Sequence, residues 1–200
     1  MIVGLTGGIG SGKTLVLKMF ESLGAAVYVS DIEAKKLMST SSKLKKAIKV
    51  LFGEEAYTEG LLNTVFIGQT VFEDKEKLNA LNKLVHPEVA SHFETFVKVH
   101  QTAPYIMYES AILFEQNKQA LFDVVLLVTA SEDIRIQRVL VRDQMNEADA
   151  RKRIQNQWPD EKKIPLADYV IKNTDLEETQ DKVLELHKIF VTSDKSRLKC

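Results

Sequence analysis

A glycine-rich segment near the N-terminus has the residue types and the spacing of a phosphate-binding loop. Gly7-Gly-Ile-Gly-Ser-Gly-Lys-Thr14 fits the pattern G-x-x-x-x-G-K-[ST], with an apolar run before it and an amphipathic run after it. In such a loop, backbone N–H groups converge on phosphate oxygens, and Cβ atoms would prevent close wrapping. We expect Lys13 to place its charge at the β- and γ-phosphates of a nucleoside triphosphate, and the Thr14 hydroxyl to bind Mg²⁺. A glycine-rich turn with an exposed lysine is the alternative, and the full match in this context disfavours it.

Acidic side chains follow two other apolar runs. Asp31 comes two residues after Ala26–Val29, and Glu109 directly follows Tyr105–Tyr108. Ligands of open parallel sheets bind beyond the carboxyl ends of the strands. A carboxylate placed there could accept the proton of an acceptor hydroxyl during phosphoryl transfer. Asp is also a favoured N-cap, and Asp31 precedes a helical pattern that starts at Ile32, so catalysis and helix capping both stay open for it.

Three arginines fall within one predicted helix, Ile134–Arg142. Arg138 and Arg142 are four residues apart and therefore share a face, and Arg135 lies one turn earlier. Guanidinium groups bind phosphate oxygens through paired hydrogen bonds and can stabilise transition-state charge. The alternative is a solvated basic face. The helix contains no Glu or Asp, so its own side chains offer this charge little neutralisation.

These candidates need a scaffold, and the apolar patterns predict a parallel α/β sheet flanked by helices. Five short runs, rich in β-branched or aromatic residues, are expected to be buried strands: Met1–Leu5, Ala26–Val29, Tyr105–Tyr108, Val124–Thr129 and Tyr169–Ile171. Four amphipathic segments are expected to be helices: Thr14–Leu23, Ile134–Arg142, Glu147–Gln157 and Leu176–Phe190. Ile32–His100 interrupts this alternation with helical patterns and offers no strand for the sheet.

Two further residues have local roles predicted from their neighbours. His86 precedes Pro87, and we interpret this pair as a helix boundary. Trp158, next to Pro159, is interpreted as a partly buried anchor, with stacking on a nucleotide base as the alternative.

The composition restricts the class of protein. The 200 residues are 44% hydrophobic and 28% charged, which is ordinary for one folded domain. The net charge of −1 argues against binding nucleic acid, and no apolar run is long enough to span a bilayer. No signal peptide is evident, and the single cysteine, Cys200, excludes an internal disulfide. We therefore expect a cytoplasmic protein with neither nucleic acid nor membrane as a partner.

The chain resembles the dephospho-coenzyme A kinase family in several segments that occur in the family's order. The first is the phosphate loop, extended back to Gly4. The others are Asp31-Ile-Glu-Ala-Lys, Leu84-Val-His-Pro87, Ile112-Leu-Phe-Glu115, Arg138-Val-Leu-Val-Arg-Asp143, Arg153-Ile-x-x-Gln157 and Ala167-Asp-Tyr-Val-Ile-x-Asn173. Many kinases share the phosphate loop, so it is the combination, from about residue 2 to residue 190, that is specific.

The resemblance implies transfer of the ATP γ-phosphoryl group to the ribose 3′-hydroxyl of dephospho-CoA, the last step of coenzyme A synthesis. It implies a P-loop NTPase-type fold, with ATP and dephospho-CoA as partners and Mg²⁺ as cofactor. We expect a monomer or a weak homo-oligomer. The implied organisation is one kinase domain, 1–191, with its core in 1–31, 101–138 and 166–191, a helical acceptor-binding insertion in 32–100, a lid at about 139–165, and a polar tail in 192–200.

The same resemblance implies roles for individual residues. Lys13 and Arg138 would stabilise the transferring phosphoryl group, and Asp31 would act as base or orienter. Thr14 would ligate Mg²⁺. The implied ATP-binding set is Gly8, Ile9, Gly10, Ser11, Gly12, Lys13, Thr14, Leu15 and Arg142. The implied acceptor-binding set is Thr6, Asp31, His86 and Glu109.

The sequence departs from the family pattern at three positions. Val29 stands where the family has the first Asp of an Asp-x-Asp element, Ala111 replaces a proline, and Leu15 replaces a usual Thr or Val. Val29 leaves Asp31 as the only carboxylate of its element, which could alter its titration or the way Mg²⁺ is held.

Two other functions stay open at this stage. One is a different small-molecule kinase with the same core and another acceptor. The other is a regulatory module that binds a nucleotide without turnover. The joint presence of Lys13, Thr14, Asp31 and Arg138 argues against the second.

Overall fold

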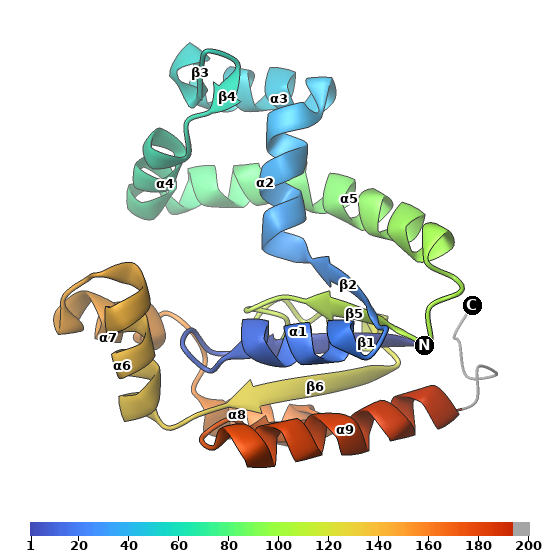
Figure 1. Ribbon diagram of the computed structural model, residues 1–200. Helices are drawn as coiled ribbons and strands as arrows, with labels where there is room; N and C mark the ends of the chain where they lie inside the picture. Colours follow the sequence, from blue (N-terminus) through green and yellow to red (C-terminus); the bar gives the residue numbers. More distant parts are fainter. Residues whose placement is uncertain (194–200) are drawn as a thin grey trace. The chain divides into compact units, whose positions relative to one another are not determined.

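The computed structural model describes residues 1–193, which form two compact units (Figure 1). One unit comprises residues 1–28 and the chain from His100 onward, and the other comprises residues 29–99. Most of the predicted polar tail, 194–200, lies outside the described residues.

The first unit is built on a parallel five-stranded sheet with the order β2-β5-β1-β6-β7. Its strands are β1 (Ile2–Gly7), β2 (Ala26–Val29), β5 (Ile106–Glu109), β6 (Val124–Thr129) and β7 (Tyr169–Lys172). The central strand β1 pairs with β5 and β6, so that Val3 lies between Met107 and Val124. Continuous apolar runs suit strands that are buried on both faces. All five predicted strands are confirmed, with ends displaced by at most two residues.

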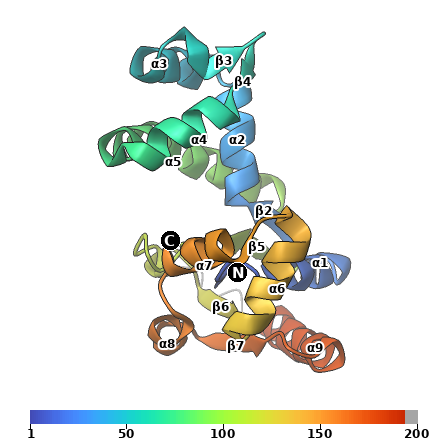
Figure 2. The same cartoon turned by 90° about the vertical axis from the view of Figure 1, so that its left-hand side faces the viewer.

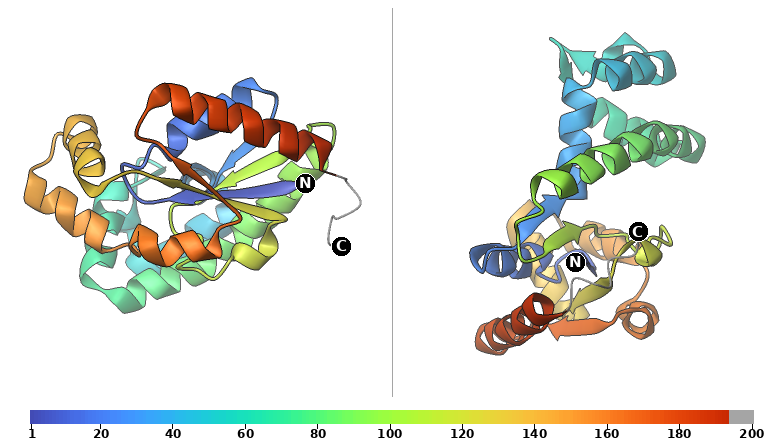
Figure 3. Two further views of the ribbon diagram at one scale, coloured as in Figure 1. Left: turned by 90° about the horizontal axis from the view of Figure 1, so that it is seen from below. Right: turned by 90° about the vertical axis from the view of Figure 1, so that its right-hand side faces the viewer.

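Helices cover both faces of this sheet. Figures 2 and 3 show α1 (Lys13–Ser22) and α9 (Leu176–Thr192) on one face and the short α8 (Asp160–Lys163) on the other. Phe20 of α1 and Phe190 of α9 lie with their ring centroids 5.9 Å apart, which joins the two helices over the sheet. The remaining helices of this unit are α6 (Glu132–Asp143) and α7 (Glu147–Gln155). Helix α8 was not predicted, because four polar residues carry no apolar periodicity.

The second unit is mainly helical, as predicted, and gives no strand to the five-stranded sheet beyond the last residue of β2. It contains α2 (Ser30–Thr40), α3 (Ser42–Phe52), α4 (Thr64–Glu73), α5 (Lys75–Val99) and a hairpin of β3 (Tyr57–Thr58) and β4 (Leu61–Leu62). Buried apolar residues of α3 and α5 form its interior: Leu44, Ile48, Phe52, Leu81, Val85 and Val89.

Two local predictions in this unit are wrong. Helix α5 runs unbroken through Pro87, so His86 does not mark a helix boundary. The packing of Leu81, Val85 and Val89 on both sides of the proline outweighs the hydrogen bond that it removes. Asp31 is not an N-cap either, because α2 begins at Ser30 and places Asp31 in its first turn, where a negative charge still suits the helix dipole.

Candidate active site

The segment between β1 and α1 has the backbone conformation of an anion-binding loop. Gly10 and Gly12 have left-handed φ values of 79° and 93°, and Ser11 N–H donates to the carbonyl oxygen of Gly8 at 3.1 Å. Helix α1 starts directly from Gly12 without a side-chain cap, and its first turn contains no acidic residue. An uncapped helix N-terminus presents N–H groups and a positive partial charge to an anion.

Side chains from distant elements bind the carbonyl groups of this loop. Arg135 Nε donates to the oxygen of Ile9 at 3.0 Å, and Asn173 Nδ2 donates to the oxygen of Ser11 at 2.9 Å. Arg138 NH1 lies 3.4 Å from the oxygen of Gly10 and 3.3 Å from that of Ser11. Because side chains from other elements donate hydrogen bonds to these carbonyl oxygens, the peptide groups of the loop are held in one orientation.

Two glycines leave room for these side chains, which would have to shift if a Cβ atom were present. A Cβ atom on Gly8 would overlap the Arg135 guanidinium, and a Cβ atom on Gly12 would overlap Asn173 Nδ2. Gly12 also has a φ that L-residues rarely adopt. The glycine spacing of the motif therefore serves the close approach of protein side chains as well as that of a phosphate.

Lys13 and Thr14 lie in the first turn of α1, as the motif predicts. Lys13 Nζ reaches back over the loop to the carbonyl oxygen of Gly8, at 3.2 Å, which brings its charge to the loop. Thr14 and Leu15 are exposed. The Thr14 hydroxyl is a hard oxygen ligand that suits Mg²⁺. Among the described residues, no group of three or more His, Cys, Asp or Glu side chains could hold a metal.

The three arginines of α6 occupy different environments. Arg135 is 5% exposed, so the alternative of a solvated basic face is wrong at this position. Arg138 NH2 donates to the carbonyl oxygen of Asn173 at 3.0 Å, in addition to its loop contacts. Arg142 is exposed and bonds to Asp143 through Nε and NH2, at 2.6 and 2.9 Å. This hydrogen-bonded pair raises the pKa of Arg142 and lowers that of Asp143.

The residues implied for acceptor binding are divided between the two units. Thr6 and Glu109 are buried at the ends of the neighbouring strands β1 and β5, where Leu5 and Glu109 are register partners. The Thr6 hydroxyl has no hydrogen-bond partner within the described part of the chain. Asp31 is exposed on α2 and His86 is half-buried on α5, both in the 29–99 unit. Their roles stay predictions.

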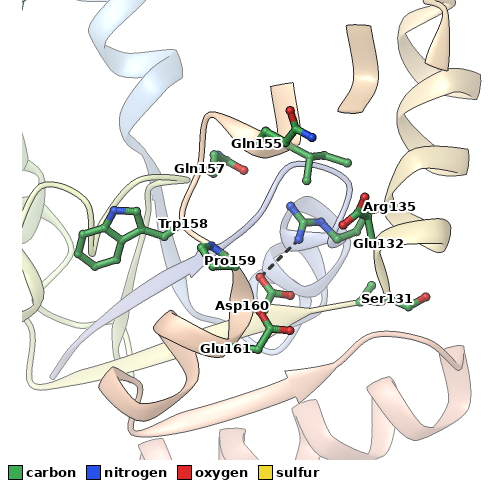
Figure 4. A pocket seen from close by; sticks show the side chains of 11 residues that line it. Ser131, Glu132, Arg135, Gln155, Gln157, Trp158, Pro159, Asp160 and Glu161 are labelled. Carbon is green, nitrogen blue, oxygen red and sulfur yellow. Dashed lines mark ion pairs between the residues drawn. The ribbon is translucent and has the colours of Figure 1, made fainter. Parts of the chain in front are cut away.

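A segment that follows α7 completes the surroundings of the loop. Gln157 Oε1 accepts a hydrogen bond from Ile9 N–H at 2.7 Å, and Asp160 Oδ1 lies 3.5 Å from Arg135 NH1. Burial raises the pKa of Asp160 despite the opposing charge of Arg135. These side chains border a pocket of about 360 Å³ in which the Arg135 guanidinium points toward Asp160 (Figure 4).

Sequence reasoning singled out neither Asp160 nor the pairing of Gln157 with the loop. Gln157 entered only as part of a family motif, and Asp160 belongs to a run of charged residues that would normally be solvated. The expectation for Trp158 is confirmed, because it packs against a buried cluster that includes Leu113 and Phe114. Lys162 Nζ lies 3.4 Å from the centroid of the Trp158 ring.

Within residues 1–193, no helix is both long and apolar enough to cross a membrane.

Comparison with known proteins agrees with this geometry. The sequence model of the dephospho-CoA kinase family matches residues 1–178. A dephospho-CoA kinase of Chlorobium chlorochromatii is 38% identical over 180 residues, covering 86% of this chain and 85% of the relative. One of Syntrophotalea carbinolica is 36% identical over 190 residues, covering 93% and 90%.

Solved structures share the fold. A crystal structure of a Thermus thermophilus protein superposes with a TM-score of 0.86 at 31% identity, covering 94% of this chain and 96% of that one. The dephospho-CoA kinase of Campylobacter jejuni gives a TM-score of 0.68 at 22% identity, with coverages of 94% and 95%. With a phosphate loop held as described and a family match over most of its length, the chain belongs to the dephospho-CoA kinase family.

Proposed function

We propose that this protein transfers the γ-phosphoryl group of ATP to the ribose 3′-hydroxyl of dephospho-CoA, giving coenzyme A and ADP. The observation that carries the proposal is the loop between β1 and α1. Its carbonyl groups are bound from outside by Arg135, Arg138 and Asn173, and it leads into an uncapped helix N-terminus. Membership of the dephospho-CoA kinase family supports the choice of acceptor.

In the proposed reaction, a bond forms between the acceptor oxygen and the γ-phosphorus while the bond to the β,γ-bridging oxygen breaks. Lys13 and Arg138 stabilise the negative charge on the transferring group and on the leaving ADP. Asp31 accepts the proton of the 3′-hydroxyl and orients it for in-line attack. The position of Asp31 supports this role, because it follows the carboxyl end of β2 by two residues and its side chain is exposed.

Mg²⁺ is the proposed metal, with Thr14 as its ligand from the protein. When bound, the ion would neutralise charge on the phosphate oxygens. The loop residues Gly8–Leu15 and Arg142 bind ATP in this proposal, and Thr6, His86 and Glu109 contribute to the acceptor site. Residues 139–165 act as a lid that excludes water from the activated phosphoryl group. We place the reaction in the cytoplasm and expect a monomer or a weak homo-oligomer.

A coupled assay of ADP release, with coenzyme A identified by mass spectrometry, tests the proposal. Purified protein with ATP and Mg²⁺ is offered dephospho-CoA, then shikimate and simple nucleosides at equal concentration. Turnover that requires dephospho-CoA supports the proposal. Turnover with another alcohol alone would identify a different small-molecule kinase, and ATP binding without turnover would identify a regulatory module.

A further inference from the structure

Ile9, in the phosphate loop, is held on both sides of its Cα by side chains from outside the loop. Its N–H donates to Gln157 Oε1 at 2.7 Å, and its carbonyl oxygen accepts from Arg135 Nε at 3.0 Å. Two successive peptide units of the loop are thereby fixed, the one that joins Gly8 to Ile9 and the one that joins Ile9 to Gly10. Because the partner of Gln157 is an N–H group, the carboxamide must present its oxygen to the loop, which also fixes the orientation of the side chain.

The two side chains that hold Ile9 are themselves anchored. Arg135 is 5% exposed and lies 3.5 Å from Asp160. Beyond Gln157, Trp158 N–H donates to Glu115 Oε1 at 3.0 Å, and the fully buried Lys163 pairs with the same oxygen at 3.0 Å. In this structure, residues 157–163 of the proposed lid are therefore held at both ends, on the phosphate loop by Gln157 and in the interior by Lys163.

We propose that Gln157 is a positioning residue for phosphoryl transfer, which acts by holding the Ile9 peptide so that the loop keeps one geometry around the polyphosphate. The inference rests on the proposed kinase function and assigns Gln157 a part in it. Small displacements of positioning groups cost large factors in rate, because the reacting atoms must be aligned closely. Loss of this contact is therefore expected to reduce kcat rather than the affinity for ATP.

The test uses the full chain with Gln157→Met, which keeps the length of the side chain and removes the acceptor oxygen. Gln180→Met is the matched control, since Gln180 is exposed on α9, outside the proposed lid and not among the residues that line the pocket. In protein labelled with ¹⁵N-isoleucine, we expect the Ile9 amide to exchange at least about 10-fold faster in Gln157→Met and at the wild-type rate in the control. We expect kcat with dephospho-CoA to fall about 10-fold or more, while KM for ATP changes by less than about threefold.

A second variant separates the hydrogen bond from the rest of the side chain. Gln157→Glu keeps an acceptor oxygen, so the Ile9 amide should stay protected and most of kcat should return, while the added negative charge raises KM for ATP. Unchanged exchange in Gln157→Met, or loss of protection in Gln157→Glu, would overturn the inference. In Gln157→Met, an effect confined to KM for ATP would also overturn the inference, and a lowered KM for ATP would identify Gln157 as a competitor for a donor of the loop. Amide exchange needs no turnover, so failure of the wild-type protein to use dephospho-CoA would count against the proposed function alone.

Discussion

Asn173 donates a hydrogen bond from Nδ2 to the carbonyl oxygen of Ser11, at 2.9 Å, and so joins the end of β7 to the phosphate loop. Its Oδ1 accepts a hydrogen bond from the Thr179 hydroxyl of α9, at 3.2 Å. Asn173 is 2% exposed, and its backbone N–H continues the hydrogen bonding between β6 and β7 by donating to the carbonyl oxygen of Thr129 at 2.8 Å. One buried carboxamide thus connects the loop, an edge strand and a helix that are far apart in the sequence.

Replacing this side chain should destabilise the protein. In Asn173→Ala, the Ser11 carbonyl and the Thr179 hydroxyl lose a buried partner, which is expected to lower the free energy of unfolding by about 1–3 kcal/mol. Urea denaturation followed by circular dichroism measures the change. The neighbouring exposed Thr174→Ala is the control, expected to stay within about 0.5 kcal/mol of wild type. Equal unfolding midpoints for the two variants would contradict the structural role of Asn173.

The sheet could be predicted because strands buried on both faces leave a clear pattern in the sequence. Val124–Thr129 and Ile106–Glu109 are almost continuous apolar runs, and the glycines of the loop identify the site directly. Periodicity also predicted α9, whose buried stripe contains Val183, Leu186 and Phe190.

What could not be predicted depends on contacts between distant parts of the chain. Arg135 and Arg138 are alike in sequence, yet Arg135 is buried among loop atoms and Asp160. The ion pair of Lys163 and Glu115 joins residues that are 48 positions apart, and nothing in the sequence of either segment indicates that they pair. At Pro87 the sequence predicted a helix end that does not exist. The proline is a strong local signal for a boundary, but the packing of buried residues on both sides of it outweighs that signal.

For the ion pair between Lys163 and Glu115, we predict that replacing both residues destabilises the protein less than replacing Glu115 alone. Lys163 is fully buried, and Glu115→Gln removes the carboxylate that forms the ion pair with it. Removal of one member of a buried pair typically costs about 3–5 kcal/mol, whereas apolar replacement of the pair costs much less. We expect Glu115→Gln to lower the free energy of unfolding by about 3 kcal/mol, and the double variant Glu115→Gln/Lys163→Met to recover at least half of that loss.

Urea unfolding of the wild type, both single variants and the double variant completes this cycle. Strictly additive losses would mean that Lys163 and Glu115 contribute independently and that their contact does not stabilise residues 157–163.

Asp31 is expected to matter for turnover far more than for stability. It is exposed and does not cap α2, so Asp31→Asn should lose only a favourable interaction with the helix dipole, at a cost of less than about 1 kcal/mol. If its carboxylate accepts the proton of the acceptor hydroxyl, kcat should fall by about 10²-fold or more. Glu76→Gln is the matched control, because Glu76 is an exposed acid in the first turn of α5. A lower melting temperature with unchanged kcat would restrict Asp31 to a structural role.

The carboxyl group of Asp160 should make stability depend on pH. Its pKa is raised above the ordinary value of 3.8 because burial disfavours the charged form. Arg135, Lys163 and Lys13 oppose this shift and Glu161 adds to it, yet burial prevails. Asp160 Oδ1 has no hydrogen bond within the described residues, and its contact with Arg135 is long at 3.5 Å.

A raised pKa in the folded state means that the unfolded chain releases this proton at lower pH than the folded protein. The stability contributed by protonated Asp160 is therefore present below its unfolded pKa and is lost as the pH rises through the folded pKa. Asp160→Asn keeps the shape of the protonated carboxyl and cannot ionise. The difference in unfolding free energy, variant minus wild type, should thus be more positive at pH 7 than at pH 4. Urea unfolding at constant ionic strength measures it, and a difference that grows on acidification would show that Arg135 holds Asp160 ionised.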